Sequence, residues 1–310
     1  MDFPLVVQPT TDVAMQDLLD WLAKQSRDLV SRARSHGAVL FRDFPLRTAE
    51  DFDSFIAAFQ LENFPYAESL SNAVRINRTE RVFTANESPP EVKIYLHHEM
   101  AQTPIYPSHL FFFCEQPAAS GGATPICRSD ELWQRLELAE PGFAADCRHK
   151  GLLYSHTMPA KDEPKSGMGR SWQETLRADS REAAERRMDQ LGYSWNWQED
   201  GSLRATTPVL PAVREVESGR FTFFNQLIAA YEGWSAAGVS ADKSITFGDG
   251  MPLPAESVQS AVEIAAELTF DVPWQQGDVV LLDNFVCMHG RRTFSGERRI
   301  LASLIHNAGN

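Results

Sequence analysis

Three residues of metal-binding type constrain the fold of this chain more than any other feature. His97 and Glu99 lie two positions apart, and His289 follows 289 − 99 = 190 positions later. Two imidazoles and one carboxylate can occupy one face of an octahedral iron(II) ion and leave the opposite face open. In an extended strand or turn, residues i and i+2 project to the same side, so His97 and Glu99 can reach one ion. The fold must then bring His289 to them.

Composition and charge restrict the class of protein. The 310 residues are 43% hydrophobic and carry a formal net charge of −13. A large core is therefore possible, whereas binding to nucleic acid or to an anionic membrane, which needs basic patches, is disfavoured. The N-terminus lacks a signal-peptide pattern, and we find no apolar stretch long enough to cross a bilayer. The four cysteines show no CxxC pair, so we expect reduced thiols and a cytoplasmic location.

The pattern of apolar residues begins α/β-like and becomes mostly β. Apolar residues at helical spacing predict helices over 12–35 and from Thr48 or Glu50 to Phe59, with further helices over 129–138 and 171–191. Short runs of β-branched and aromatic residues predict strands over 5–7, 38–41, 110–114, 221–224, 268–270, 279–282 and 300–305. No internal repeat is present.

Candidate ligands at both ends of a long β region predict a particular fold. A double-stranded β-helix, the jelly-roll core of cupins, places sequence-distant strands side by side around an open barrel. We therefore expect a mainly β protein with helical insertions, its cupin-like core flanked by α-helices. We further expect residues 1–310 to form a single domain, with a largely helical insertion around 160–200.

Several longer motifs resemble one family. The chain is similar to the taurine dioxygenase-like iron(II)/2-oxoglutarate-dependent oxygenases, and within them to the branch related to the aspartyl hydroxylase of syringomycin biosynthesis. The matching stretches follow the family's order along nearly the whole chain: 37–44, 96–100, 113–118, 121–126, 224–226, 248–250, 274–279, 283–284 and 289–301. The resemblance implies that His97, Glu99 and His289 bind iron.

The resemblance also implies a pocket for 2-oxoglutarate, whose far carboxylate needs a cation and a hydroxyl donor. The family places an arginine about ten residues past the distal histidine, which here is Arg299, with Arg298 as the fallback. Guanidinium suits a carboxylate because it presents two parallel donors. Thr124 would supply the hydroxyl, since its separation from His97 (124 − 97 = 27) matches the family's. Adjacent strand residues face opposite ways, so only one arginine should reach the pocket, and Arg299 is preferred.

Two positions bear on the reaction. In taurine dioxygenase a second arginine, four residues after the first, grips the substrate sulfonate; here that position is Ser303. The family's halogenases replace the iron-binding carboxylate by a small residue, whereas Glu99 is present here. The resemblance therefore implies oxygenation or desaturation of a substrate that is not a sulfonate.

Other residues have two possible roles. Arg75, before the first ligand, could grip a substrate carboxylate or form a surface salt bridge. Asn225 could line the site or bind backbone. His98 faces away from His97 and should be a packing residue, and the Asp283-Asn284 pair should shape a turn.

Taken together, these features predict an iron(II)/2-oxoglutarate-dependent dioxygenase that consumes O₂ and releases succinate and CO₂, with ascorbate as a possible aid in vitro. The expected reaction is hydroxylation of an sp³ carbon of an amino-acid-type substrate in specialised metabolism, free or tethered to a carrier protein. Desaturation, epimerisation or cyclisation by the same chemistry is the alternative. A non-catalytic cupin-like iron-binding sensor is a second one, against which Thr124 and Arg299 count.

Overall fold

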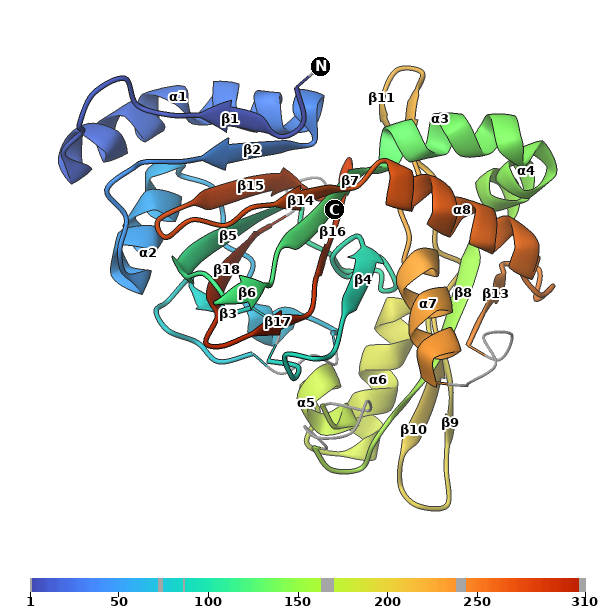
Figure 1. Ribbon diagram of the computed structural model, residues 1–310. Helices are drawn as coiled ribbons and strands as arrows, with labels where there is room; N and C mark the ends of the chain where they lie inside the picture. The colour runs from blue at the N-terminus through green and yellow to red at the C-terminus, as the bar shows by residue number, and fades with distance from the viewer. Residues whose placement is uncertain (1, 72–74, 86, 163–169, 238–243, 307–310) are drawn as a thin grey trace.

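Two β-sheets stack at the centre of the molecule, as the computed structural model shows for residues 2–71, 75–85, 87–162, 170–237 and 244–306 (Figure 1). The larger sheet has the order β1 (Leu5–Val7), β2 (Ala38–Phe41), β15 (Val279–Asp283), β5 (His109–Gln116), β18 (Arg299–Ile305), β3 (Phe83–Thr84). The smaller sheet has the order β14 (Phe270–Val272), β7 (Thr124–Arg128), β16 (Cys287–Arg291), β4 (Ile94–His97). A short pair, β6 (Ser120–Gly121) and β17 (Phe294–Ser295), lies beside them.

Alternation along the strands gives each sheet an inner and an outer face. On β5 and β18, Phe112 and Ile300 belong to a core cluster that also contains Ile126 and Cys287 of the smaller sheet. This cluster fills the space between the sheets. Because His289 lies two residues after Cys287, it shares the inner face of β16, and Thr124 shares the inner face of β7 with Ile126. The strands therefore direct candidate site residues into the space between the sheets.

Two helices cover the outer face of the larger sheet. Helix α1 (Met15–His36) buries Leu18, Leu22 and Leu29, at the spacing that an amphipathic helix requires, and Gly37 follows it with φ +83°. Helix α2 (Ala49–Ala58) begins with a capping box between Thr48 and Asp51. These helices pack on the outward residues of β5, β15 and β18 and form a second core cluster.

The sandwich of sequence-distant strands, with helices outside it, confirms the predicted jelly-roll core. Strand β16 lies between β4 and β7 in antiparallel register, with His289 opposite His97 and also opposite Ile126. His97 and His289, 289 − 97 = 192 positions apart in sequence, are thus neighbours on adjacent strands, as the metal-site hypothesis required.

A long excursion leaves the sandwich after β7 and returns at β14, and it lies beside the sheets in Figure 1. Its strands form a sheet of order β13 (Ile245–Phe247), β8 (Leu152–Met158), β10 (Leu203–Thr206), β9 (Ser194–Trp197), and the hairpin of β11 (Arg214–Glu217) and β12 (Arg220–Thr222). Its helices are α3 (Ser129–Ala139), α4 (Pro141–Lys150), α5 (Trp172–Leu176), α6 (Arg181–Leu191), α7 (Leu227–Ala237) and α8 (Ala255–Glu267). Cys127 and Met288, on the outer face of the smaller sheet, pack against this excursion.

The segment around 160–200 is helical in part. The single helix predicted over 171–191 is wrong, because it is divided into α5 and α6. Arg177 takes a left-handed conformation with φ +53°, and the Ser180 side chain caps the start of α6. Residues 163–169 lie outside the described part of the chain. Among the described residues, no helix is both long and apolar enough to span a bilayer.

Candidate metal centre

The three predicted ligands meet on the inner side of the smaller sheet. His97 is the last residue of β4, Glu99 lies in the turn that follows, and His289 is on β16. The Glu99 Oε2 atom is 3.3 Å from His289 Nε2 and 3.9 Å from His97 Nε2. Ligands at about 2.1 Å on adjacent corners of an octahedron are about 3 Å apart, so a small movement of these atoms would complete a metal site. One potential ligand atom from each residue lies within 4.8 Å of the others.

The protonation states of the three side chains suit metal binding. Burial lowers the pKa of His97 to about 4, helped by the nearby His289, so its ring is neutral. His97 Nδ1 is 2.8 Å from the Tyr95 carbonyl oxygen, which leaves Nε2 directed to the centre. Burial alone would raise the pKa of Glu99, yet the Arg75 guanidinium and the two imidazoles hold it well below its usual range. Glu99 is therefore a carboxylate.

The turn that carries Glu99 is fixed by a side chain from the far end of the sequence. Met100 follows Glu99 with φ +59°, an uncommon conformation for a residue other than glycine. Asn284 Oδ1 accepts the Glu99 N–H at 2.8 Å, and Asn284 Nδ2 donates to the Glu99 and Pro107 carbonyl oxygens at 3.0 and 2.8 Å. The turn predicted at the Asp283-Asn284 pair is formed by Asp283, whose Oδ1 accepts the Phe285 N–H at 2.8 Å, whereas the Asn284 side chain acts on the distant Glu99 turn.

His98 points away from the candidate metal centre. Its Nδ1 atom is 2.5 Å from the Asn284 carbonyl oxygen, and its ring packs 4.8 Å from that of Phe224. Burial lowers its pKa to about 3. The position agrees with the packing role predicted for it.

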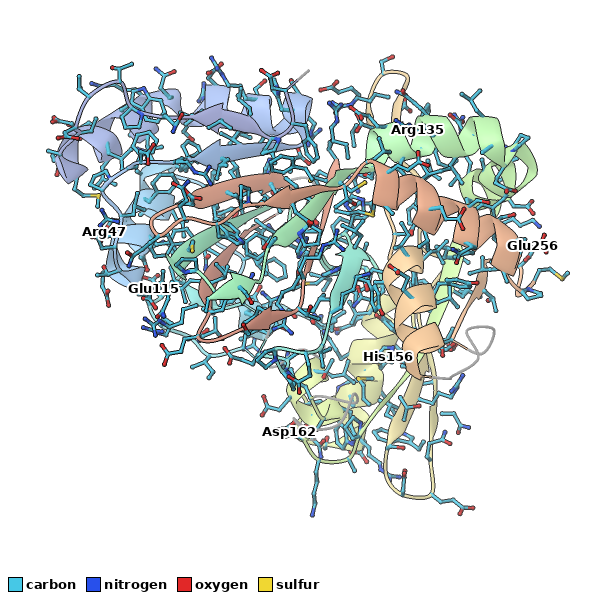
Figure 2. The ribbon with its side chains drawn as sticks, in the orientation of Figure 1. Arg47, Glu115, Arg135, His156, Asp162 and Glu256 are labelled. Carbon is cyan, nitrogen blue, oxygen red and sulfur yellow. The ribbon has the colours of Figure 1, made fainter. Side chains whose placement is uncertain are left out.

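Of the two candidate arginines, Arg298 faces the metal ligands and Arg299 does not. Arg298 lines a cavity together with Thr124, His97 and His289, whereas the half-exposed Arg299 side chain donates from Nε to Glu115 Oε2 at 2.9 Å. Figure 2 shows Glu115 at the left-hand edge of the molecule, near α2. The preference for Arg299 is therefore wrong on geometry.

Strand alternation explains this difference. Arg298 directly precedes β18, and its side chain lies on the same face as that of Ile300, which points between the sheets. A register irregularity separates Arg299 from Ile300. For the same reason, Ser303 is not the residue four positions after the pocket arginine. That position is Ala302, which lies in the inner core cluster, while Ser303 pairs with Phe111 of the outer face. The conclusion that the second arginine is missing stands.

Arg298 is a buried cation without an acidic partner in the described part of the chain. Its Nε donates to the Gly122 carbonyl oxygen at 2.9 Å, and its Nη2 lies 3.5 Å from Thr124 Oγ1. No carboxylate of the described residues lies within ion-pairing distance of it. Burial lowers its pKa to about 10, so it still carries its charge at neutral pH. A cation in this setting calls for an anionic ligand.

Thr124 is prepared to donate a hydrogen bond. Its Oγ1 accepts from Trp274 Nε1 at 3.0 Å, so the hydroxyl hydrogen remains for another acceptor. The contact between Trp274 and Thr124 spans 150 positions, so no local sequence pattern indicates it. Gly122 leaves room for the neighbouring arginine, because a Cβ at Gly122 would lie 3.0 Å from Arg298 Cδ.

Arg75 and Asn225, the candidates for substrate contacts, are both buried. Arg75 Nη2 donates to Glu99 Oε1 at 2.9 Å, and the Arg75 side chain is only 8% exposed, so the alternative of a surface salt bridge is wrong. The Asn225 amide is used by backbone: Nδ2 donates to the Ala212 carbonyl oxygen and Oδ1 accepts the Leu227 N–H, each at 2.9 Å. Asn225 is absent from the lining of the cavity at the metal ligands, so the backbone alternative holds.

The cavity at the ligands is small and cationic. It has a volume of about 50 Å³, and Arg75, Arg291 and Arg298 all line it, although the chain as a whole is acidic. Two larger cavities, of about 550 and 270 Å³, have no candidate metal ligand in their linings. The second of these borders Gln102 and Thr103, just past the Glu99 turn.

Comparison with known proteins decides the family. The model of the taurine catabolism dioxygenase TauD, TfdA family matches residues 3–304. The chain belongs to this family. A clavaminate synthase-like protein of Arabidopsis thaliana is 40% identical over 309 residues, which is 97% of this chain and 93% of the relative. The dapdiamide synthesis protein DdaC of Enterobacter agglomerans is 28% identical over 282 residues, covering 87% of this chain and 82% of that protein.

A solved structure shares the fold. The structure of AAD-2 in complex with Mn(II) and N-oxalylglycine superposes with a TM-score of 0.56 at 15% sequence identity, covering 99% of this chain and 96% of that one. Together with the family match, this supports the jelly-roll description of the core. This member of the TauD, TfdA family is an Fe(II)/2-oxoglutarate-dependent dioxygenase.

The residues present fit that cofactor chemistry. Glu99 Oε2 is buried, has no hydrogen-bond partner among the described residues and faces two imidazole nitrogens, and these three groups are a donor set for iron(II). The buried Arg298 beside the Thr124 hydroxyl matches the needs of a dicarboxylate cosubstrate. Both observations come from the chain's own side chains.

Proposed function

We propose that this dioxygenase hydroxylates an sp³ carbon of an amino acid or amino-acid derivative in a biosynthetic pathway. Similarity over most of the chain to a dapdiamide synthesis protein supports a biosynthetic role. Similarity to a clavaminate synthase-like protein supports the same class of chemistry. The missing second arginine, whose position is occupied by Ala302, argues against a sulfonate substrate.

His97, Glu99 and His289 would hold iron(II), and Arg298 with Thr124 would hold the far carboxylate of 2-oxoglutarate. The observation that carries this assignment is the buried Arg298 guanidinium, which has no carboxylate partner among the described residues. Two guanidinium N–H groups can point at one carboxylate, and the Thr124 hydroxyl can add a third hydrogen bond. Because both residues lie on the inner faces, that carboxylate would lie between the two sheets.

When bound, iron and 2-oxoglutarate would activate O₂, which is the oxidant: one oxygen atom would enter succinate as 2-oxoglutarate loses CO₂, and the other would be available for the substrate. The protein's own contribution is to orient and to exclude water. Glu99 keeps the third ligand position occupied by a carboxylate, which favours oxygenation over halogenation. Phe112 packs its ring 5.1 Å from His289, and Ile300 lines the same cavity, so the ligands are shielded from solvent on the side of the larger sheet.

The substrate would occupy the cavity of about 270 Å³ beside the Glu99 turn. The lining of this cavity includes His156 of β8, Ala229 of α7 and Gln226, which directly precedes α7. Gln226 Nε2 donates to the His98 carbonyl oxygen at 3.0 Å, which connects the residue before α7 to the metal-binding turn. The volume is close to the lower end of ligand pockets, about 300 Å³, and suits a small polar molecule.

The experiment is a screen of free amino acids and carrier-bound aminoacyl groups for stimulated release of succinate by the iron-loaded protein. Hydroxylation predicts a product heavier by one oxygen atom in the mass spectrum. A product lighter by two hydrogens would instead establish desaturation or cyclisation, and one of unchanged mass epimerisation. Stimulation by sulfonates alone would contradict the proposal. If the iron-loaded protein forms no succinate either with or without a substrate, an iron-binding sensor would be favoured.

A further inference from the structure

We propose that Arg75 is a positioning residue of the metal centre, which holds Glu99 Oε1 so that this carboxylate binds the metal through Oε2 alone. The proposal rests on the metal centre described above. Arg75 Nη2 donates to Oε1 at 2.9 Å, whereas Oε2 has no hydrogen-bond partner among the residues that the structure describes and faces the Nε2 atoms of both histidines. The two oxygens of one carboxylate thus have separate partners.

Arg75 is itself held in place by aromatic rings. Its guanidinium lies 4.7 Å from the centre of the Tyr66 ring and 5.3 Å from that of Phe83. Such stacking suits guanidinium, which is planar and weakly hydrated. The side chains of Arg75 and Glu99 are 8% and 4% exposed, so water competes little for this ion pair. The segment before β4 therefore contributes a fixed charge to the centre.

The way in which Glu99 binds the metal matters for what else can bind there. A triad of two imidazoles and one carboxylate oxygen covers one face of an octahedron and leaves the opposite face for 2-oxoglutarate and O₂. A carboxylate that binds through both oxygens would take a position that these molecules need. Because Arg75 binds Oε1, the whole open face of the metal remains available to 2-oxoglutarate and O₂. Hydrogen-bond partners of metal ligands typically change metal affinity about 10- to 100-fold when they are removed.

The test compares Arg75→Met with Arg78→Met, a matched change in the same segment. Arg78 is 41% exposed and its nearest carboxylate is that of Glu115, at 3.8 Å. Calorimetric titration with Mn(II) should show binding about 10- to 100-fold weaker in Arg75→Met and unchanged in Arg78→Met. Arg75→Lys, which keeps the charge, should recover much of the loss. Water-proton relaxation of the Mn(II) protein should show one fewer exchangeable water in Arg75→Met, because Glu99 then binds through both oxygens.

The outcomes separate the proposal from the metal centre on which it rests. Unchanged Mn(II) affinity and an unchanged number of bound waters in a folded Arg75→Met protein would overturn the proposal and leave Arg75 a purely structural residue. If Arg75→Met does not fold, Arg75→Gln decides by the same two readouts. Absence of Mn(II) binding by the unaltered protein would instead refute the metal centre itself.

Discussion

The exchange of roles between Arg298 and Arg299 gives the sharpest test of the cosubstrate pocket. Arg298→Met removes a buried cation that faces the metal ligands, whereas Arg299→Met removes a half-exposed partner of Glu115. Loss of a buried, hydrogen-bonded charge partner of a ligand costs about 2–5 kcal/mol. At about 1.4 kcal/mol for each tenfold, a cost of about 3 kcal/mol weakens 2-oxoglutarate binding about 150-fold. Surface ion pairs contribute less than about 1 kcal/mol, so Arg299→Met should leave this affinity within about twofold.

The assay is calorimetric titration of the Mn(II)-loaded variants with 2-oxoglutarate at neutral pH. Arg298→Lys, which keeps the charge but loses the planar pair of donors, should fall between the two. Without 2-oxoglutarate, Arg298→Met should melt no lower than the unaltered protein, because the change removes a buried cation that has no carboxylate partner among the described residues. A large loss of affinity in Arg299→Met with little loss in Arg298→Met would refute the reasoning.

Three further outcomes follow from the same contacts. His98→Ala should destabilise the fold by on the order of 2 kcal/mol, because a buried packing residue is lost. Its Mn(II) affinity, measured by calorimetry, should nevertheless stay within a few-fold of that of the unaltered protein. Abolished Mn(II) binding would make His98 a ligand. Ala229→Trp, which fills the 270 Å³ cavity, should abolish substrate-stimulated succinate release and spare the substrate-independent rate. The control variant Ala266→Trp, on the exposed side of α8, should change neither rate. Equal stimulation by substrate in both variants would place the substrate elsewhere. Burial, with a smaller effect of Arg204, lowers the pKa of His156 to about 4 from 6.5, so its stabilising contribution is complete above pH 6.5 and is lost as pH falls towards 4. Between pH 6.5 and pH 4, the free energy of unfolding measured with denaturant should therefore fall by about 2 kcal/mol less in His156→Gln than in the unaltered protein. An equal fall in the two proteins would contradict a neutral His156 ring in the folded state.

Sequence patterns were sufficient wherever the determinants were local. The periodic leucines of α1, the capping box at Thr48 and the run of apolar and aromatic residues in β5 define these elements within one turn or one strand. The metal ligands could be predicted because His97 and Glu99 are close in sequence and the motif around His289 is long.

Sequence patterns failed where a contact joins distant segments or depends on strand register. Asn284 holds the Glu99 turn across 185 positions, and Trp274 reaches Thr124 across 150. No local spacing reveals such pairs. The choice between Arg298 and Arg299 depends on an irregularity at the start of β18, and a shift of one residue moves a side chain to the other face. The net charge of −13 likewise gave no sign of three arginines around one cavity.

The central claim is that His97, Glu99 and His289 hold an iron ion that 2-oxoglutarate can chelate. Anaerobic titration of the iron(II)-loaded protein with 2-oxoglutarate, followed by visible absorption, tests this claim most directly. The account predicts a weak charge-transfer band that saturates with 2-oxoglutarate and is missing in Glu99→Ala and His97→Ala. No band in the unaltered protein, together with no succinate on admission of air, would contradict it.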